Sequence, residues 1–360
     1  MIIVMDPSAT EAQVADVVER LSRTGIRVLR LDGERVVLST AGPAPGTESS
    51  PTTPVGTEAI ADMPGVSATL NGDGATPMVA APHATAAPED EAWDPDNGAP
   101  TDAEERGFQV KDRWIGGAEL FIAAGPCSVE DADTMDRTAA AVAAAGGAAL
   151  RAGAFKPRSS PYSFQGMGET GLAIAHDAAA AHGLLLVSEV LDATQIPIAA
   201  RYVDVLQVGA RNMYNTSLLR ELGRARRPVL LKRGLAATID EWLSAAEYIV
   251  AAGNPRVILC ERGIRTFETA TRNTLDLNAI PVLRERTRLP VLVDPSHGTG
   301  RRVYVRPLAR AAIACGADGL LVEAHPEPDR AASDAAQTVD LETMAQVVSE
   351  AEVMKRAIAR

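Results

Sequence analysis

One group of side chains in this sequence is of the types that bind transition metals. It combines a thiol, an imidazole and two carboxylates: Cys127, His297, Glu323 and either Asp329 or Asp334. These ligands suit a divalent ion of intermediate softness such as Mn, Fe, Co or Zn, whereas Mg²⁺ would not favour the thiolate. Ligands so far apart in sequence have no diagnostic spacing. A buried cysteine is more often a small apolar core residue, which is our interpretation of Cys260 and Cys315.

A second group is cationic and predicts an anionic substrate. Its members stand at or after the ends of apolar runs: Arg151, Lys156, Arg158, Arg211, Lys232 and Arg262. Six cations gathered in one place would repel one another without an anionic ligand, and arginine offers paired hydrogen bonds to phosphate and carboxylate. The alternative is that each cation pairs with a nearby carboxylate. That alternative applies to Arg262 beside Glu261 and to Arg265, but poorly to residues 156–158, which have no acid nearby in sequence.

These candidates are tied together by a repeating pattern of strands and helices. Near-continuous apolar runs are typical of parallel strands that are buried on both faces. Alanine-rich segments with helical periodicity separate them, and eight such repeats in about 250 residues predict a (β/α)8 barrel, whose functional residues lie at the C-terminal ends of the strands. A doubly wound sheet is the alternative, but the sequence has no glycine-rich nucleotide-binding loop to support it. The runs are 120–125, 148–155, 184–190, 204–210, 228–234, 257–263, 290–296 and 319–324.

The N-terminal segment predicts a separate small α+β domain. Residues 1–39 give a strand, an amphipathic helix and a hairpin with its turn at Asp32-Gly33, which is most of a ferredoxin-like unit. Residues 57–71 would complete it, with 42–56 as an inserted loop. We therefore expect a ferredoxin-like domain over 1–72, an acidic Pro/Ala-rich disordered linker over 73–105, and a catalytic barrel over 106–360.

Charge and composition exclude several classes of protein. Residues 42–105 hold twelve acidic residues and no lysine or arginine, so this segment carries a charge of −12. The whole chain of 360 residues has the same net charge of −12. The acidity is thus a property of one segment that can bury little, and it argues against nucleic acid as a partner. No apolar run approaches the roughly 20 residues of a membrane helix. Three cysteines in a long chain form no disulfide framework and indicate a reducing cytoplasm.

The motifs that carry these residues resemble one enzyme family. AGPCSVE, RAGAFKPRSSPYSFQG, SEVLD, LQVGARNM, LLKRG, CERGIRTFE, VDPSHGTG and VEAHPEPDRAASDAAQ occur in order between Arg106 and about Asp340. Together they are similar to 3-deoxy-D-arabino-heptulosonate 7-phosphate (DAHP) synthase of the type Iβ branch, which is related to 3-deoxy-octulosonate 8-phosphate synthase. The resemblance implies a metal-assisted, aldol-like condensation of phosphoenolpyruvate with erythrose 4-phosphate, the first step of the shikimate pathway.

The resemblance also implies a role for each candidate residue. By motif position the metal ligands fall on Cys127, His297, Glu323 and Asp334. Asp334 is preferred to Asp329 because the last ligand of the family lies in a Ser-Asp pair shortly before a glutamine. Lys156 is a candidate proton donor to the aldehyde, and a water near His297 and Glu323 is a candidate nucleophile. Phosphoenolpyruvate would contact Arg151, Lys156, Glu189, Arg211, Lys232 and Arg262, and the phosphate of erythrose 4-phosphate would contact Arg158 and Ser159.

Several alternatives remain open at this stage. The octulosonate 8-phosphate synthase reaction on arabinose 5-phosphate is one, although Arg158 stands where that neighbouring family has an asparagine-containing loop. A secondary-metabolism variant on another aldose phosphate is a second. A catalytically dead sensor of aromatic amino acids is a third, but no metal ligand is missing and Lys156 is present. The type Iβ branch often carries a ferredoxin-like domain for feedback inhibition by aromatic amino acids, and we expect a homo-oligomer, either a dimer or a tetramer.

Overall fold

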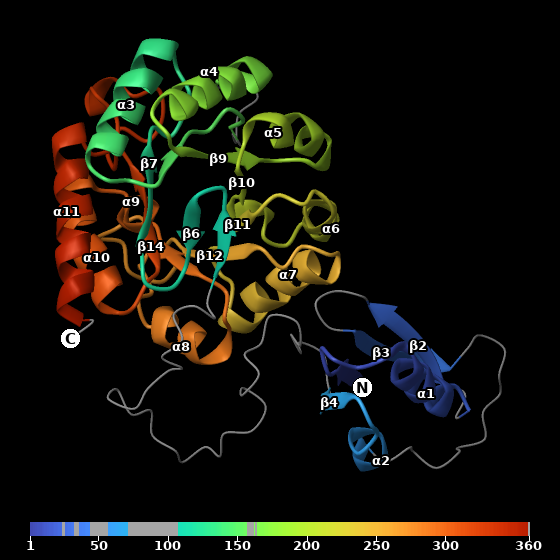
Figure 1. Cartoon of the computed structure of the whole chain (residues 1–360). Coiled ribbons are helices and arrows are strands. Elements are labelled where there is room, and N and C mark those ends of the chain that lie inside the picture. Colours follow the sequence, from blue (N-terminus) through green and yellow to red (C-terminus); the bar gives the residue numbers. More distant parts are fainter. Residues whose placement is uncertain are drawn as a thin grey trace.

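The chain folds into a small α+β unit and a closed barrel, each described here by itself (Figure 1). The structure is a computed structural model, and it describes residues 1–23, 26–31, 36–43, 57–70, 107–156, 162 and 164–358. The expected turn at 32–33, most of the expected inserted loop and the expected linker lie outside the described residues.

The N-terminal unit is a four-stranded antiparallel sheet with two helices. Its strand order is β2-β3-β1-β4, and the core is formed by apolar side chains such as Ile3, Val17, Leu21 and Leu38. The first helix begins with a reciprocal hydrogen-bond pair between Thr10 and Gln13, which satisfies free backbone donors at the helix start. Both the expected hairpin and the expected completing helix and strand are present. The elements are β1 Ile2–Met5, α1 Glu11–Ser22, β2 Ile26–Leu31, β3 Val37–Pro43, α2 Thr57–Ala61 and β4 Val66–Leu70.

Eight parallel strands close the second unit into a barrel, as predicted. Each pairs in parallel with its two neighbours, and β14 pairs with β7 to close the ring. Nearly all of their residues are buried, because helices cover the outer face and side chains fill the interior. The strands are β7 Phe121–Gly125, β8 Ala149–Arg151, β9 Leu185–Val190, β10 Val205–Val208, β11 Val229–Lys232, β12 Val257–Glu261, β13 Val291–Val293 and β14 Gly319–Glu323.

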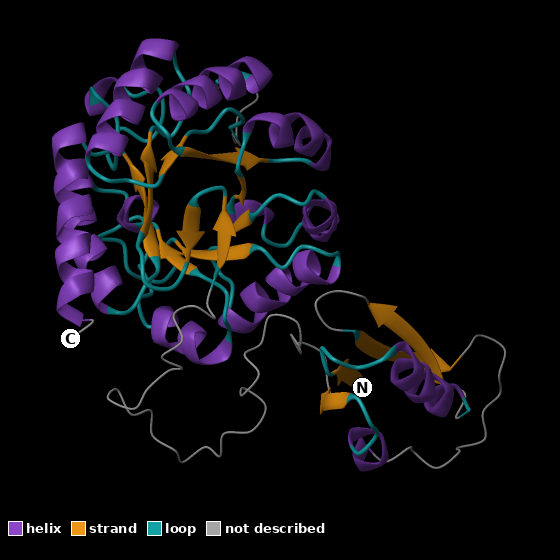
Figure 2. Ribbon diagram, in the orientation of Figure 1, coloured by secondary structure: helices purple, strands orange, loops and turns teal. Residues whose placement is uncertain are grey.

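Helices form a ring around the barrel (Figure 2). Their inward faces carry many alanines, and these small residues pack with strand side chains in one continuous core. The main helices are α3 Ala132–Ala144, α4 Gly168–Ala181, α5 Ile196–Tyr202, α6 Thr216–Arg224, α7 Ile239–Ala251, α8 Ala279–Arg286, α10 Arg302–Ala314 and α11 Leu341–Ile358. Shorter turns are η2 Ala193–Gln195, η3 Ala210–Asn212, α9 Pro295–Thr299 and η4 Pro328–Arg330.

A short hairpin, which the sequence did not predict, precedes the barrel. It pairs β5 Phe108–Val110 with β6 Arg113–Ile115, and three-residue strands are too short for an alternating pattern to be recognised. Val110 and Ile115 pack with inward side chains from the N-terminal ends of the barrel strands, including Phe121. The hairpin therefore covers the end of the barrel opposite to the strand C-termini.

Two of the cysteines differ in their surroundings. Cys260 is completely buried in β12, as predicted. Cys315 is exposed, so its assignment to packing was wrong. It is the C-terminal cap of α10, one residue beyond the last helical residue, and is exposed there.

Among the described residues, no helix combines the length and the apolar character needed to cross a membrane.

The hairpin packing predicts a large stability effect at one position. Ile115→Ala removes a fully buried side chain from the cluster that covers the barrel end, and should lower the free energy of unfolding by about 2–5 kcal/mol. Gln109→Ala, on an exposed residue of the same hairpin, is the control and should cost much less. Urea unfolding of both variants tests this. Equal losses would contradict the packing role of the hairpin.

Candidate active site

The C-terminal ends of the barrel strands surround a polar cavity of about 280 Å³. Metal-ligand types and cations from both predicted groups line it together. They come from the ends of strands that lie far apart in sequence but next to one another in the closed ring. Its lining includes Cys127, Arg151, Lys156, Glu189, Arg211, Lys232, Arg262, His297 and Asp334.

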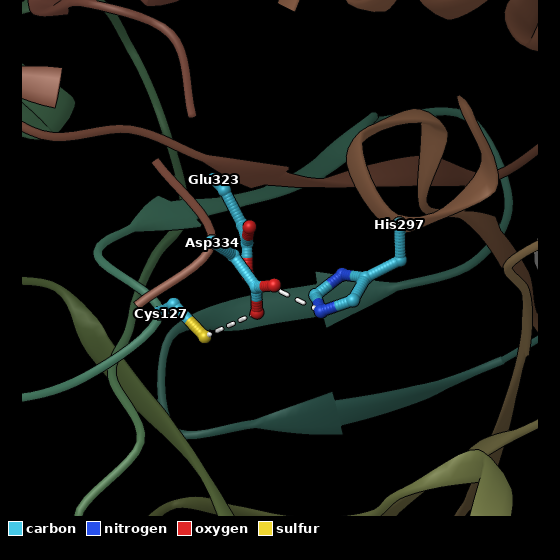
Figure 3. Close-up of side chains that lie close together, drawn as sticks. All are labelled: Cys127, His297, Glu323 and Asp334. Carbon is cyan, nitrogen blue, oxygen red and sulfur yellow. Dashed lines mark hydrogen bonds and ion pairs between the residues drawn. The ribbon is translucent and has the colours of Figure 1, made fainter. Parts of the chain in front are cut away.

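Three side chains of this cavity and the buried Glu323 next to them form a candidate metal centre. One ligand atom from each of Cys127, His297, Glu323 and Asp334 lies within 4.8 Å of the others, and Figure 3 shows the four side chains converging. Atoms that bind one ion at about 2.0–2.3 Å lie at most about 4.6 Å apart. The cluster is therefore close to the size that a single ion requires. Asp329 is instead 86% exposed in its side chain and pairs with Arg302 at 2.6 Å.

His297 is positioned by the short helix α9, which starts directly after β13. Asp294 caps this helix and accepts a hydrogen bond from the His297 backbone at 2.9 Å. The same carboxylate lies 2.7 Å from His297 Nδ1. A carboxylate can only accept here, so Nδ1 carries a proton and Nε2 is left as the free ligand atom. Burial lowers the pKa of His297, which favours the neutral form that binds metals.

Glu323 ends β14 and is held on both of its oxygens. Oε1 accepts from Arg151 at 2.9 Å and lies 3.3 Å from His297 Nε2, while Gln337 donates to Oε2. Burial alone would raise its pKa, but the positive charge of Arg151, and that of His297 whenever it is protonated, hold the pKa of Glu323 below its ordinary value. The carboxylate is thus kept ionised although only 1% of the residue is exposed.

The cysteine thiol and the last carboxylate face each other across the cluster. Cys127 Sγ lies 3.2 Å from Asp334 Oδ2 and 2.9 Å from Lys156 Nζ. Burial, with a contribution from Glu323, raises the pKa of Cys127 to about 11, so the thiol keeps its proton until a cation replaces it. Asp334 has a φ of 57°, in a region that few side chains other than Asn and Asp tolerate.

The cations divide into paired and unpaired sets. Arg151 contacts Glu323, Lys156 contacts Cys127, and Lys232 donates to Asp294 at 2.6 Å. Within the described part of the chain, no carboxylate lies at ion-pair distance from Arg211 or Arg262. Burial lowers the pKa of Arg262, although the nearby charge of Asp294 opposes this shift. Arg262 is buried, so its charge would be stabilised by an anionic ligand, whereas Arg211 is exposed to solvent.

The alternative that Arg262 pairs with Glu261 is not supported. The Glu261 side chain accepts from Arg233 at 2.9 Å and from the Gly263 backbone at 2.6 Å. Adjacent residues of a strand point to opposite faces, so Glu261 and Arg262 are directed apart. Arg265, the other residue to which the carboxylate alternative applied, is also without a carboxylate partner in the described regions.

Several lining residues were not found from the sequence. Arg272 and Asn273 reach the cavity because Ile264 and Thr274 form an antiparallel bridge that folds the loop after β12 back on itself. Arg272 donates to Asp334 at 3.3 Å and to Gln337 at 2.9 Å. Arg272 and Asn273 do not follow an apolar run, whereas the predicted site residues were found at the ends of such runs. Gln207 and Asn212 also line the cavity.

The remaining predicted residues fall in two places. Glu189 lies in β9 and accepts a hydrogen bond from Gln207 of β10 at 3.1 Å. A Cβ added to Gly209 would come within 2.1 Å of the Glu189 carboxylate oxygen. Gly209 therefore leaves the space that Glu189 occupies. Arg158 and Ser159 lie outside the described residues.

Family models match both units of the chain. Residues 101–358 match the model described as "DAHP synthetase I family", and residues 1–71 match the "DAHP synthase ferredoxin-like domain". The first match alone spans well over half of the chain. The chain belongs to the DAHP synthetase I family.

Similar proteins support this membership. A phospho-2-dehydro-3-deoxyheptonate aldolase from Thermotoga maritima is 50% identical over 251 residues, which are 70% of this chain and 74% of that protein. A crystal structure titled as the Thermotoga maritima enzyme of that name (DAHP synthase) aligns with a TM-score of 0.70 and 39% identity, covering 99% of this chain and 97% of the other. A 2-dehydro-3-deoxyphosphooctonate aldolase from Syntrophotalea carbinolica is 34% identical over 205 residues, which are 54% of this chain and 73% of that protein.

The candidate metal centre predicts that one cysteine controls metal content. Cys127→Ala should weaken divalent metal binding by more than about 100-fold, because even residues that only support a ligand contribute 10–100-fold. Cys315→Ala removes an exposed thiol and is the matched control, with metal content unchanged. Elemental analysis after dialysis against a chelator and reloading measures both. Full metal retention in Cys127→Ala would rule out the thiol as a ligand.

Proposed function

We infer that this chain condenses phosphoenolpyruvate with D-erythrose 4-phosphate to give DAHP and inorganic phosphate, the first step of the shikimate pathway. The protein is an enzyme of the transferase class. The observation that carries this conclusion is one cavity, in a family member, that has a cluster of four metal-ligand side chains at its wall and is also lined by cations. The cations can bind an anionic substrate, and a metal ion beside them would polarise a carbonyl group.

The charges of the cavity support a specific placement of phosphoenolpyruvate. Its phosphate would lie with Arg211, Lys232 and Arg262, where two guanidinium groups are unpaired. Its carboxylate would lie with Arg151 and Lys156, close to the metal cluster. Erythrose 4-phosphate would bind on the outer side, with its phosphate held by Arg158 and Ser159.

The residues then account for the chemistry. C3 of phosphoenolpyruvate attacks the aldehyde carbon to form the new C–C bond, water adds at C2, and phosphate leaves as the C2 ketone forms. A bound divalent ion would polarise the aldehyde carbonyl. Lys156 is positioned to donate the proton that the aldehyde oxygen requires. Arg151, Lys232 and Arg262 stabilise the negative charge of the departing phosphate and of the carboxylate from fixed positions, and Glu189 lies near C2.

Three further properties belong to the same proposal. The bound ion is Mn, Fe, Co or Zn, since a thiolate among carboxylates and imidazole selects ions of intermediate softness. The protein works in the cytoplasm, where a reducing environment protects the thiol of Cys127. It assembles as a homo-oligomer, either a dimer or a tetramer.

A comparison of aldose phosphates tests the proposed reaction. The metal-loaded full chain, given phosphoenolpyruvate, should consume erythrose 4-phosphate with at least about tenfold higher kcat/KM than arabinose 5-phosphate or ribose 5-phosphate, because a site fitted to one sugar loses contacts with another. Phosphate release measures all three reactions. A preference for arabinose 5-phosphate would instead support the octulosonate reaction. Activity on none of the three would point to a secondary-metabolism substrate or a sensor.

Two variants test the division of the cationic wall. Arg158→Ala should raise KM for erythrose 4-phosphate by roughly tenfold or more, because a charge-assisted contact contributes about 1.5–3 kcal/mol, with little change for phosphoenolpyruvate. Lys232→Ala should show the opposite bias. Steady-state kinetics with each substrate varied in turn gives the comparison. Equal effects on both substrates would refute the division.

We propose that residues 1–72 regulate a barrel that folds and works without them. The barrel has its own closed core, and a truncated Thermotoga maritima DAHP synthase aligns with 72% of this chain at a TM-score of 0.66. A chain that starts at residue 106 should therefore keep its turnover and lose any inhibition by tyrosine or phenylalanine. Inhibition curves for the two chains decide this. Equal inhibition would place the effector site in the barrel, and an inactive truncated chain would make the small domain structural.

A further inference from the structure

We propose that Asp294 couples the two ends of the cavity, so that a divalent ion and a phosphate group each strengthen the binding of the other. Asp294 touches neither ligand in the proposed function, on which this inference rests, and it is a positioning residue. Its carboxylate joins Lys232, a phosphate-site cation, to His297, a metal ligand.

The connection passes through a single atom. Asp294 Oδ2 lies 2.6 Å from Lys232 Nζ and 2.7 Å from His297 Nδ1, and Oδ1 accepts from the His297 backbone at 2.9 Å. Only 1% of Asp294 is exposed, so water cannot readily replace a partner that weakens its bond. Two charged or polarisable donors therefore share one buried acceptor, and a change at either donor is felt at the other.

The sign of the coupling follows from this sharing. A divalent ion on His297 Nε2 withdraws electron density from the ring and makes Nδ1–H a stronger donor. Asp294 is then drawn towards the ring, which leaves more of the Lys232 charge available for phosphate. A phosphate on Lys232 has the converse effect, because Asp294 then interacts more strongly with His297 and makes it a better ligand. By thermodynamic linkage, the factor by which the ion strengthens phosphate binding must equal the factor by which phosphate strengthens ion binding.

Two other routes could couple Mn²⁺ binding to phosphate binding without Asp294. Asp294 variants separate the first route, and the choice of probe reduces the second. Direct attraction between the ion and the phosphate needs no protein group and would persist in any Asp294 variant. The contact between Arg151 and Glu323 joins the metal cluster to the other substrate end. Inorganic phosphate as the probe carries no carboxylate, which reduces the contribution of that second route.

The experiment measures Mn²⁺ binding to the full chain with and without saturating inorganic phosphate, at constant ionic strength, by the electron paramagnetic resonance signal of free Mn²⁺. In the wild type, phosphate should lower the Kd for Mn²⁺ by about fivefold or more. In Asp294→Asn the factor should fall below about twofold, because an amide cannot accept from all three donors. Asp318→Asn is the control. Asp318 is also 1% exposed and accepts from Arg284 and the Val291 backbone at the start of strands β13 and β14, so its variant should keep the wild-type factor.

A second pair of variants covers the case in which Asp294→Asn does not fold. Lys232→Gln removes the other end of the connection, while Arg211 and Arg262 remain to bind phosphate, so coupling should be lost at saturation. Arg262→Gln removes a cation that interacts with Asp294 only through longer-range charge and not through a hydrogen bond, so phosphate should bind more weakly but keep most of its effect on Mn²⁺. Equal coupling in Lys232→Gln and Arg262→Gln would overturn the inference.

The remaining outcomes also discriminate. If Asp294→Asn binds Mn²⁺ weakly but keeps the wild-type factor, Asp294 only orients His297 and the coupling role is wrong. If the wild type binds both ligands independently, the inference fails while the proposed function stands. If the wild type binds neither ligand, the proposed function itself fails.

Discussion

The site depends on burying opposite charges side by side at the end of a closed barrel. Arg151, Lys156 and Lys232 are each at most 7% exposed, and an isolated ion at such a position would cost several kcal/mol. Each instead contacts a candidate metal ligand or the residue that supports one. The cations therefore stabilise the ionised forms of Glu323 and Asp294, and the carboxylates fix the cations. The cavity is set in geometry before any ligand enters it.

Barrel closure is what makes this pairing available. Glu323 ends the last strand and pairs in register with Gly125 of the first, which brings it beside Cys127 although nearly two hundred residues separate them in sequence. Arg151 ends the next strand of the ring and reaches the same carboxylate. The hairpin of β5 and β6 covers the opposite end and packs with the inner core. The packed apolar core thus lies behind the site, and the polar groups lie at the open end.

The strands and most of the site could be predicted from the sequence for one physical reason. In a parallel barrel each buried strand is a visible apolar run, and the polar residues at or just after its C-terminal end lie around the mouth. The partners could not be predicted, because pairing across the mouth depends on side-chain direction: Glu261 is next to Arg262 yet contacts Arg233. Arg272 was missed because its loop returns through the bridge of Ile264 and Thr274. The exposed position of Cys315 follows from where α10 ends, which periodicity does not fix.

The distribution of paired and unpaired cations gives the cavity a direction. At the metal end, Arg151 and Lys156 lie against Glu323 and Cys127. At the other end, Arg211 and Arg262 have no carboxylate partner among the described residues. A dianion such as a phosphate group gains most where positive charge is not already neutralised, so the field draws it away from the cluster of metal ligands. A substrate with phosphate at one end and a smaller anionic group at the other is thereby oriented by charge before any close contact forms, and the carbon atoms between its two ends are brought to the boundary between the cationic wall and the metal centre.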